Sequence, residues 1–326
     1  MSLDIDDYIA KEVHACEYTL DDYTTEPARW CKGCGAHGAL GAVQRMLREN
    51  NEAPENVITV SGIGCSSRFP HYLKTYGFHT LHGRALPVSV GVSLARPEMK
   101  LLTVMGDGDC FSIGGNHWLH TLRYNINATV IILDNEIYAL TKKQASPTSR
   151  QGTMSNTSPR GSYLEPLNPL SIVLGVTNLS FVAQTASWLP GHMQATLDRA
   201  WKHKGLAFVR ILQRCPVFMP DAFSGASAEF PAQFLEHCSG ITPDKGILRN
   251  APTVAHDPSD INAAQKIAAN AHKDLEPLGL LYLNTEVPTY NEVRYSHVQQ
   301  SDKFAKAELL NQYLDSYAIG NPNEEG

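Results

Sequence analysis

Apolar runs alternate with amphipathic stretches through the central part of this 326-residue chain. Near-continuous runs of valine, isoleucine and leucine predict buried strands, whereas apolar residues three or four positions apart predict helices. The predicted strands are 56–60, 100–105, 129–135, 179–185 and 206–215, and the predicted helices are 36–49, 87–95, 116–125 and 191–203. Strands that alternate with helices are typical of an α/β fold, in which helices cover both faces of a mostly parallel sheet.

The two ends of the chain differ in pattern from this central part. Residues 1–28 are acidic and irregular, which predicts an N-terminal arm. Within the α/β domain, expected at 29–225, the Ser-, Thr-, Pro- and Gly-rich stretch 141–165 predicts a functional loop. Residues 226–326 are more polar and contain one predicted solvated helix at 257–273. We expect this last part to be a C-terminal extension that packs on a partner subunit.

Charge and composition exclude some classes of partner. The net charge is −6, and no cluster of Lys and Arg is present of the kind that binds phosphates of nucleic acid. The N-terminus lacks the apolar segment of a secretory signal, and no apolar run is long enough to span a membrane. We therefore expect a cytoplasmic protein that binds neither nucleic acid nor membrane. In a reducing compartment its seven cysteines should bind metal or be buried rather than form disulfides.

Polar residues follow two neighbouring predicted strands. Asp107 lies in a Gly-Asp-Gly-Asp turn after one strand, and Asn135 ends the next. Carboxyl ends of parallel strands meet at one edge of the sheet, where open α/β sheets bind ligands. With the backbone carbonyl of Ile137, these side chains predict a Mg²⁺ site and so a diphosphate ligand. Gly106 and Gly108 would let the backbone approach that ligand. The alternative is a plain turn with a capping asparagine.

Four of the cysteines form a second pattern. Cys31 and Cys34 are separated by two residues before a predicted helix, and Cys65 and Cys215 lie just past strand ends. All four can converge on the edge of the sheet that carries the predicted magnesium site. Four thiolates bind either a structural zinc ion or a [4Fe–4S] cluster, and spacing does not separate the two. Of the other three, we expect one to be incidental in the arm, one to pack against the cofactor and one to be buried: Cys16, Cys110 and Cys238, respectively.

These motifs together resemble a known family. Gly-Asp-Gly followed later in the chain by Asn-Asn is the thiamine diphosphate motif, although here Asp134 replaces the first Asn. The segments "CKGCG", "GIGCSSR", "HGRALPVSVG", "DNEIYALTKKQASPTS" and "RCPVF" are similar to the β subunits of 2-oxoacid:ferredoxin oxidoreductases. The resemblance covers about residues 29–217, in order.

The resemblance implies a set of cofactors and a reaction. The cofactors are thiamine diphosphate, Mg²⁺ and one [4Fe–4S] cluster on the four cysteines; a structural zinc has no reason to lie beside thiamine, whereas an electron acceptor must. The implied reaction is the oxidative decarboxylation of a 2-oxoacid with coenzyme A, giving an acyl-CoA, CO2 and reduced ferredoxin. The residues expected to contact thiamine diphosphate are Gly64, Cys65, Ser66, His82, Gly106, Asp107, Gly108, Asp109, Asn135, Ile137 and Tyr138.

The resemblance also implies a partner. The glutamate that activates the pyrimidine ring of thiamine normally comes from a separate domain, and this chain has one α/β unit. We therefore expect an α subunit that carries this glutamate, in a heterodimer or a dimer of heterodimers that transfers electrons to ferredoxin.

Cationic residues near these motifs indicate a substrate. Arg68 can bind a second carboxylate with two-pronged geometry, which favours 2-oxoglutarate and succinyl-CoA. Leu140, Lys142 and the following Lys143 are expected in the same pocket, and His82 and Arg84 precede a helix N-terminus, where anions bind. The alternatives are a structural ion pair for Arg68, with pyruvate or broad specificity, a non-redox thiamine decarboxylase, and a zinc-binding α/β protein.

Overall fold

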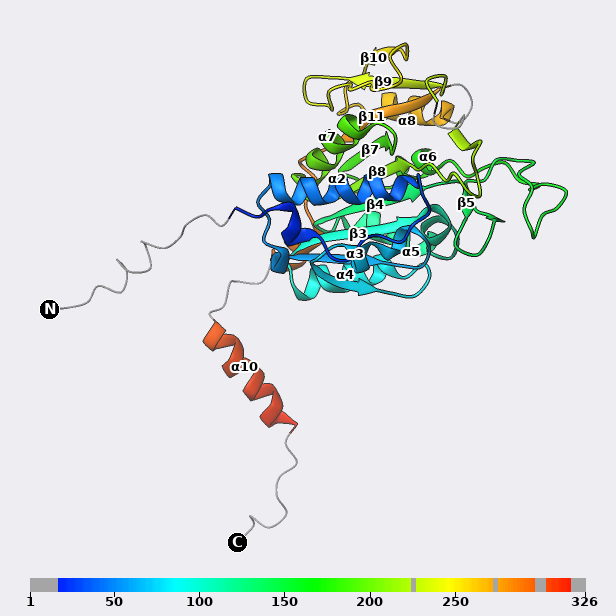
Figure 1. The fold of residues 1–326 in the computed structure, drawn as a ribbon. Coiled ribbons are helices and arrows are strands. Elements are labelled where there is room, and N and C mark those ends of the chain that lie inside the picture. The colour runs from blue at the N-terminus through cyan, green and yellow to red at the C-terminus, as the bar shows by residue number, and fades with distance from the viewer. Residues whose placement is uncertain (1–16, 224–226, 272–274, 297–302, 318–326) are drawn as a thin grey trace, which may run out of the picture. The chain divides into compact units, whose positions relative to one another are not determined.

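The computed structural model describes residues 17–223, 227–271, 275–296 and 303–317. Its main-sheet strands are β1 (Val57–Ser61), β2 (Tyr76–His79), β3 (Lys100–Gly106), β4 (Ala128–Asp134), β7 (Phe181–Ala186), β8 (Leu206–Leu212), β9 (Ala232–Glu236), β10 (Thr253–Ala255) and β11 (Glu276–Leu283). They are ordered β10-β9-β11-β7-β8-β4-β3-β1-β2 (Figure 1). Two short strands, β5 (Ile137–Tyr138) and β6 (Gln144–Ala145), pair separately.

Most neighbouring strands of this sheet run parallel. The six strands from β2 to β7 in the order above all point the same way. β11 pairs antiparallel with β7, and β9 and β10 run parallel to β11. The predicted α/β fold with a mostly parallel sheet is therefore confirmed.

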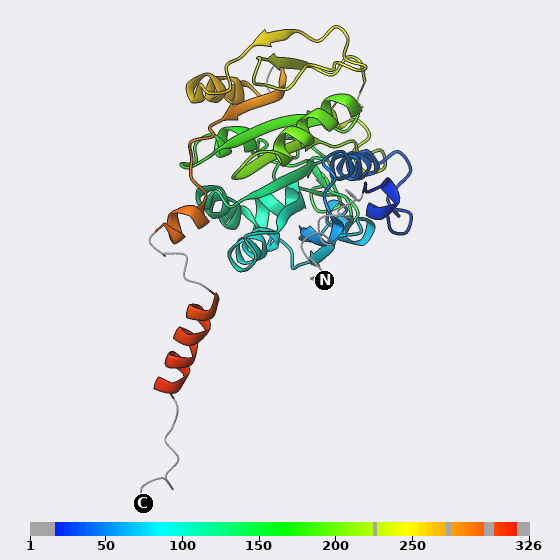
Figure 2. The same cartoon turned by 90° about the vertical axis from the view of Figure 1, so that its left-hand side faces the viewer.

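Helices cover both faces of the sheet (Figure 1 and Figure 2). Among the described residues of Met1–Thr289, the α-helices are α2 (Gly35–Glu49), α3 (Phe69–Tyr72), α4 (Ala85–Ala95), α5 (Gly115–Tyr124), α6 (Pro169–Val173), α7 (Pro190–Trp201) and α8 (Ile261–Asn270). The separate unit Tyr290–Gly326 contains α9 (Tyr290–Tyr295) and α10 (Lys303–Ser316). Side chains alternate along a strand, so Leu102 and Val104 pack towards α2 and α7, whereas Leu101 and Met105 pack towards α4 and α5. Because both faces are buried, the strands read as continuous apolar runs.

One strand that the sequence did not predict forms an edge of the sheet. All four residues of β2 are exposed, and the strand pairs in parallel with β1. Its sequence, Tyr-Gly-Phe-His, has no apolar run, because an exposed edge strand buries little side-chain area. The predicted loop at 141–165 has no helix, and its only strand is the two-residue β6.

The structure divides the chain at a different place from the one predicted. β9, β10 and β11 belong to the central sheet although they lie within 226–326. The first compact unit is Met1–Thr289 and the second is Tyr290–Gly326, so no boundary falls at residue 225. The pairing of β11 with β7 joins segments nearly a hundred residues apart, which the local polar composition does not indicate. Packing of the C-terminal part on a partner stays a prediction.

The last residues of the predicted N-terminal arm are anchored. Tyr23, in the short helix η1 (Leu20–Tyr23), is buried, and its hydroxyl donates to the carbonyl oxygens of Leu47 at 3.2 Å and Glu52 at 2.7 Å. Cys16 lies outside the described residues. Among the helices of the described ranges, none is both long and apolar enough to cross a bilayer.

Candidate active site

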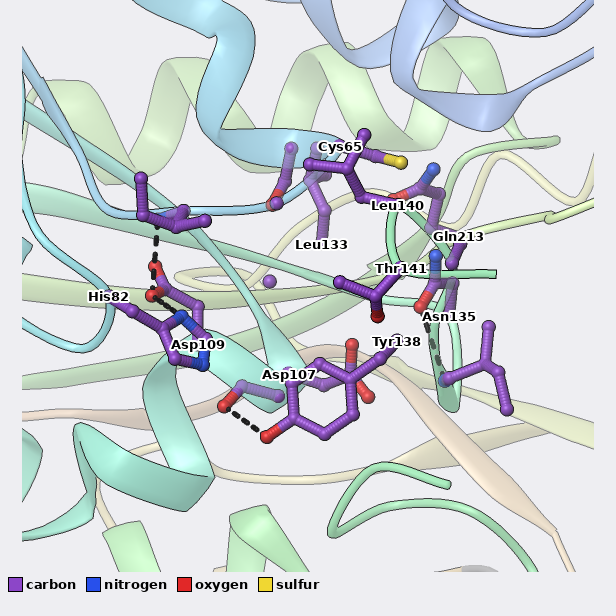
Figure 3. Close-up of a pocket in the computed structure, with 17 residues that line it drawn as sticks. Cys65, His82, Asp107, Asp109, Leu133, Asn135, Tyr138, Leu140, Thr141 and Gln213 are labelled. Atoms are coloured by element: carbon purple, nitrogen blue, oxygen red, sulfur yellow. Dashed lines mark hydrogen bonds and ion pairs between the residues drawn. The ribbon is translucent and has the colours of Figure 1, made fainter. Parts of the chain in front are cut away.

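A cavity of about 280 Å³ opens at the carboxyl ends of β1, β3 and β4 (Figure 3). All of the residues predicted to contact thiamine diphosphate line it. The lining also includes residues that were not predicted as cofactor contacts: Ile63, Leu133, Ala139, Leu140, Thr141 and Gln213. The parallel strands thus bring segments from 63 to 141 to one edge of the sheet, as the topology requires.

Asp107 is a buried carboxylate that lies near a second carboxylate, Asp134. Its side chain is 2% exposed, and its Oδ2 lies 2.8 Å from the hydroxyl of Thr148. That hydroxyl also lies 2.9 Å from Oδ1 of Asp134, although it has one hydrogen to donate. Burial, followed by the charge of Asp134, raises the pKa of Asp107 to about 7. A divalent cation beside Asp107 would offset both effects, so this position fits Mg²⁺.

Asp134 is neutralised by a cation from the neighbouring strand. Arg210 of β8 is 0% exposed, and its Nε and Nη2 lie 2.8 and 2.7 Å from Oδ2 of Asp134. Its Nη1 donates to the side-chain carbonyl of Gln184 at 2.8 Å. The Asp that replaces the first Asn of the motif is thus matched by a buried Arg. Sequence reasoning missed this pair, although an Arg inside the apolar run "LAFVRIL" was a visible signal.

Removal of Arg210 should therefore destabilise the fold. In Arg210→Met, Asp134 would be left as a buried carboxylate without its ion-pair partner, which costs about 3–5 kcal/mol. Urea unfolding of the purified chain measures this change. The control is Arg96→Met, which breaks the exposed pair with Glu98 and should cost at most about 1 kcal/mol. Equal stability of the two variants would contradict the role given to Arg210.

The loop after β4 folds back over the cavity. Glu136, Lys142 and Lys143 have positive φ angles of 58°, 73° and 76°, a conformation that is costly outside glycine and that concentrates at functional sites. The hydroxyl of Tyr138 donates to the carbonyl of Gly108 at 3.0 Å. A Cβ on Gly108 would come within 2.2 Å of the Tyr138 ring. The close packing of Tyr138 therefore also requires a glycine at position 108, in addition to the predicted approach of the backbone to the cofactor.

Asp109 ties three loops together at the rim of the cavity. Its Oδ1 accepts from the backbone N–H of Gly83 at 2.6 Å and of Ile63 at 3.2 Å. The same oxygen lies 2.8 Å from Nδ1 of His82 (Figure 3). Asp109 thus lines the cavity and also holds the neighbouring loops in place. Arg84, by contrast, does not line the cavity, because its guanidinium donates to backbone carbonyl oxygens.

A second cavity of about 120 Å³ adjoins the first. Cys31, Cys34, Cys65 and Cys215 all line it. The residues that line both cavities are Cys65, Asn135, Ala139, Leu140 and Gln213. Over the described ranges, no three His, Cys, Asp or Glu side chains are arranged to hold a metal ion as they stand. The four thiols therefore border one space without enclosing a single point.

Backbone and side-chain contacts orient these cysteines. Cys34 precedes helix α2, and its N–H donates to the carbonyl of Cys31 at 3.1 Å. The indole of Trp30 donates to the carbonyl of Cys65 at 2.7 Å. Burial, followed by the charges of the other three cysteines, raises the pKa of Cys65 to about 11. A bound cation is what would hold several such thiols in their ionised, ligating form.

For two further cysteines and one lysine, the surroundings in the structure differ from those that we predicted. Cys110 is buried in the core beside α4 and α5 rather than against the cavity. Cys238 is exposed in the turn after β9, so the prediction that it is buried was wrong. Arg68 and Lys142 line the second cavity, whereas Lys143 lines neither of the two.

Comparisons with known proteins agree with this geometry. Residues 62–211 match the family model described as "Thiamine pyrophosphate enzyme, C-terminal TPP binding domain". The β subunit of 2-oxoacid:ferredoxin oxidoreductase 1 from Aeropyrum pernix is 35% identical over 306 residues, which cover 92% of this chain and 87% of that protein. The chain belongs to the β subunits of the 2-oxoacid:ferredoxin oxidoreductases. The resemblance that the motifs indicated is confirmed, and the chain is a subunit of an enzyme.

Two further relatives are named for one 2-oxoacid. The β subunit is 44% identical over 209 residues to the 2-oxoglutarate oxidoreductase subunit KorB of Mycobacterium tuberculosis, which covers 64% of this chain and 56% of that protein. A solved structure of 2-oxoglutarate:ferredoxin oxidoreductase from Magnetococcus marinus superposes with a TM-score of 0.75 at 35% identity, covering 90% of this chain and 96% of that chain. That structure is described with 2-oxoglutarate, coenzyme A and succinyl-CoA bound.

Proposed function

We propose that this β subunit serves the oxidation of 2-oxoglutarate, with coenzyme A as acyl acceptor and ferredoxin as electron acceptor, giving succinyl-CoA and CO2. The observation that carries the proposal is the shared wall between the cavity with the thiamine motif and the cavity with four cysteines. Thiamine diphosphate supplies the carbanion chemistry of decarboxylation, and an iron–sulfur cluster accepts single electrons. Their adjacency favours an oxidoreductase over a non-redox decarboxylase.

Asp107, Asn135 and the backbone carbonyl of Ile137 are the proposed Mg²⁺ ligands. The first two follow β3 and β4 at the sheet edge, and the buried carboxylate of Asp107, whose pKa is raised by burial and by the charge of Asp134, supports a cation there. Oδ1 of Asn135 lies 3.3 Å from the backbone nitrogen of Ile137, so the turn between these residues is already formed. Mg²⁺ leaves coordination positions open for diphosphate oxygens, which the cavity beside Gly106 and Gly108 can receive.

The four cysteines of the second cavity are the proposed ligands of one [4Fe–4S] cluster. Each iron at a corner of such a cluster takes one thiolate, so the ligands surround a space rather than a point. Their arrangement around one cavity supports this assignment. A zinc site has no comparable reason to share a wall with the thiamine cavity.

The complete enzyme is proposed to need an α subunit. The described residues that line the thiamine cavity include no glutamate, and a glutamate is the group that activates the pyrimidine ring. The apolar side chains of Ile63, Leu81 and Ile113 are exposed near this cavity's rim residues, which suits a contact with another subunit. A heterodimer or a dimer of heterodimers in the cytoplasm remains the prediction.

Arg68 and Lys142 are the proposed contacts for the distal carboxylate of the substrate. Both line the second cavity, which joins the thiamine cavity through Leu140 and Cys65. The Arg68 guanidinium lies 5.6 Å from the centre of the Tyr72 ring, so its stem is supported by packing. Two cations that line the cavity adjoining the thiamine cavity suit a dicarboxylate such as 2-oxoglutarate. The broader naming of the Aeropyrum relative keeps broad specificity as the second candidate.

The test is substrate preference in the complete enzyme. We expect the wild type to prefer 2-oxoglutarate to pyruvate in kcat/KM. Arg68→Ala should lose a charge-assisted contact of about 1.5–3 kcal/mol, or about 10- to 150-fold in kcat/KM for 2-oxoglutarate, with a small change for pyruvate. Steady-state assays with viologen as electron acceptor measure both ratios.

Arg29 offers a matched control. It lines the same cavity, but its side chain is 74% exposed and pairs with Glu26. Arg29→Ala should leave the ratio of the two efficiencies unchanged. Equal losses for both substrates in Arg68→Ala would make Arg68 a structural residue, and a wild-type preference for pyruvate would overturn the substrate assignment.

A further inference from the structure

Gln213 lies where the two cavities meet. Its side chain is 1% exposed and lines both the thiamine cavity and the cysteine cavity. Figure 3 places its amide on the side of the thiamine cavity where Asn135 also lies. Its amide nitrogen Nε2 lies 3.2 Å from the sulfur of Cys34, within hydrogen-bond distance for a sulfur acceptor. A single side chain thus contacts the wall of one cavity and a sulfur of the other.

Several contacts hold this side chain in place. The backbone N–H of Gln213 donates to the carbonyl of Asp134 at 2.7 Å, which continues the pairing of β8 with β4 by one residue. The N–H of Gly35 donates to the carbonyl of Arg214 at 3.0 Å and so docks the start of α2 against the same segment. A Cβ at Gly35 would come within 2.9 Å of Cγ of Gln213. The close packing leaves room for the glutamine only because residue 35 is a glycine.

A fixed N–H donor on a cysteine sulfur has a defined effect on an iron–sulfur cluster. Hydrogen bonds to the sulfurs stabilise the electron-rich reduced form, so they raise the reduction potential. We propose that Gln213 raises the potential of the cluster by donating to Cys34, and is thereby a positioning residue for electron acceptance beside thiamine. This inference rests on the proposed cluster. It goes beyond that proposal because it names the residue that sets the reduction potential of the cluster.

Two substitutions separate this role from packing. Gln213→Leu keeps most of the side-chain volume and removes the donor. Gln213→Glu keeps the shape, and above the pKa of this buried carboxyl its carboxylate can only accept hydrogen bonds and adds negative charge. A residue that only fills space should tolerate both changes without altering the potential. If Gln213 donates to Cys34, both substitutions should lower the reduction potential of the cluster, and Gln213→Glu should lower it further than Gln213→Leu.

The experiment uses the complete enzyme, purified without oxygen and titrated with redox dyes while the reduced cluster is followed by electron paramagnetic resonance. Iron content is measured first. We expect wild-type iron in both variants and more negative potentials, with the reduction equilibrium constant about tenfold lower in Gln213→Leu, the worth of one hydrogen bond. The control is Gln194→Leu on α7, which changes a glutamine outside both cavities.

The outcomes are distinguishable. Unchanged potentials in fully loaded variants would overturn the role of Gln213 and leave the proposed function intact. Loss of the cluster from both variants would also contradict tuning, because it would make Gln213 a requirement for assembly. A wild-type enzyme without iron would instead overturn the cluster itself.

Discussion

Cys65→Ala should leave the complete enzyme without the proposed iron–sulfur cluster. Cys65 lines both cavities, and its loop is held by the bond from the Trp30 indole to its carbonyl. A cluster that loses one of four thiolates keeps an iron corner without a protein ligand, and alanine cannot replace it. We therefore expect iron content near zero and loss of the broad violet–blue absorption. Iron analysis and absorption spectra of anaerobically purified protein measure the effect.

Cys238→Ala is the matched control for this prediction. Cys238 is also a free cysteine, but it is exposed in the turn after β9, away from the cavity residues. Its variant should keep the iron of the wild type. Full iron in Cys65→Ala would show that this thiol is not a ligand. A colourless wild-type protein that contains zinc and no iron would show that the four cysteines bind a structural zinc ion instead.

Asp107→Asn should abolish Mg²⁺-dependent binding of thiamine diphosphate while the fold survives. The carboxylate is the only charged ligand proposed for the cation, and loss of even a supporting contact costs about 10- to 100-fold in metal affinity, so we expect a weakening of about 100-fold or more. Titration calorimetry of the purified chain with thiamine diphosphate, with and without Mg²⁺, measures it.

Although Asp107→Asn should weaken cofactor binding, it should not lower the stability of the cofactor-free fold. Because burial and Asp134 raise the pKa of Asp107 from its ordinary value to about 7, the cofactor-free chain loses stability as the pH rises from about 4 to about 7, and the full cost is present above that range. Asparagine removes this cost, so at pH 8 the variant should be at least as stable as the wild type in urea unfolding. Asp198→Asn, which alters an ion pair with Lys202 on α7, is the control and should bind the cofactor normally. Unchanged cofactor affinity in Asp107→Asn would remove Asp107 from the site.

The sequence alone determined the fold class and the edge of the sheet at which the candidate cofactor cavity lies. Long Val-, Ile- and Leu-rich runs predicted strands β1, β3, β4, β7 and β8 because a strand buried on both faces places most of its side chains in the core. Asp107 and Asn135 directly follow two of these strands, and parallel strands end at one edge. Local pattern and topology rules were therefore enough to bring the cofactor motifs together.

Only the tertiary structure decided the end of the first unit and the electrostatic partners of the site. β11 pairs with β7 across the boundary that composition had indicated at residue 225. Asp134 contacts Arg210, which lies 76 residues away in sequence, and Gln213 contacts Cys34, which lies 179 residues away. Periodicity describes which face of an element is buried, but it carries no information on which distant side chain lies opposite. The sheet supplies that information, because it sets neighbouring strands in register and fixes what each polar side chain meets.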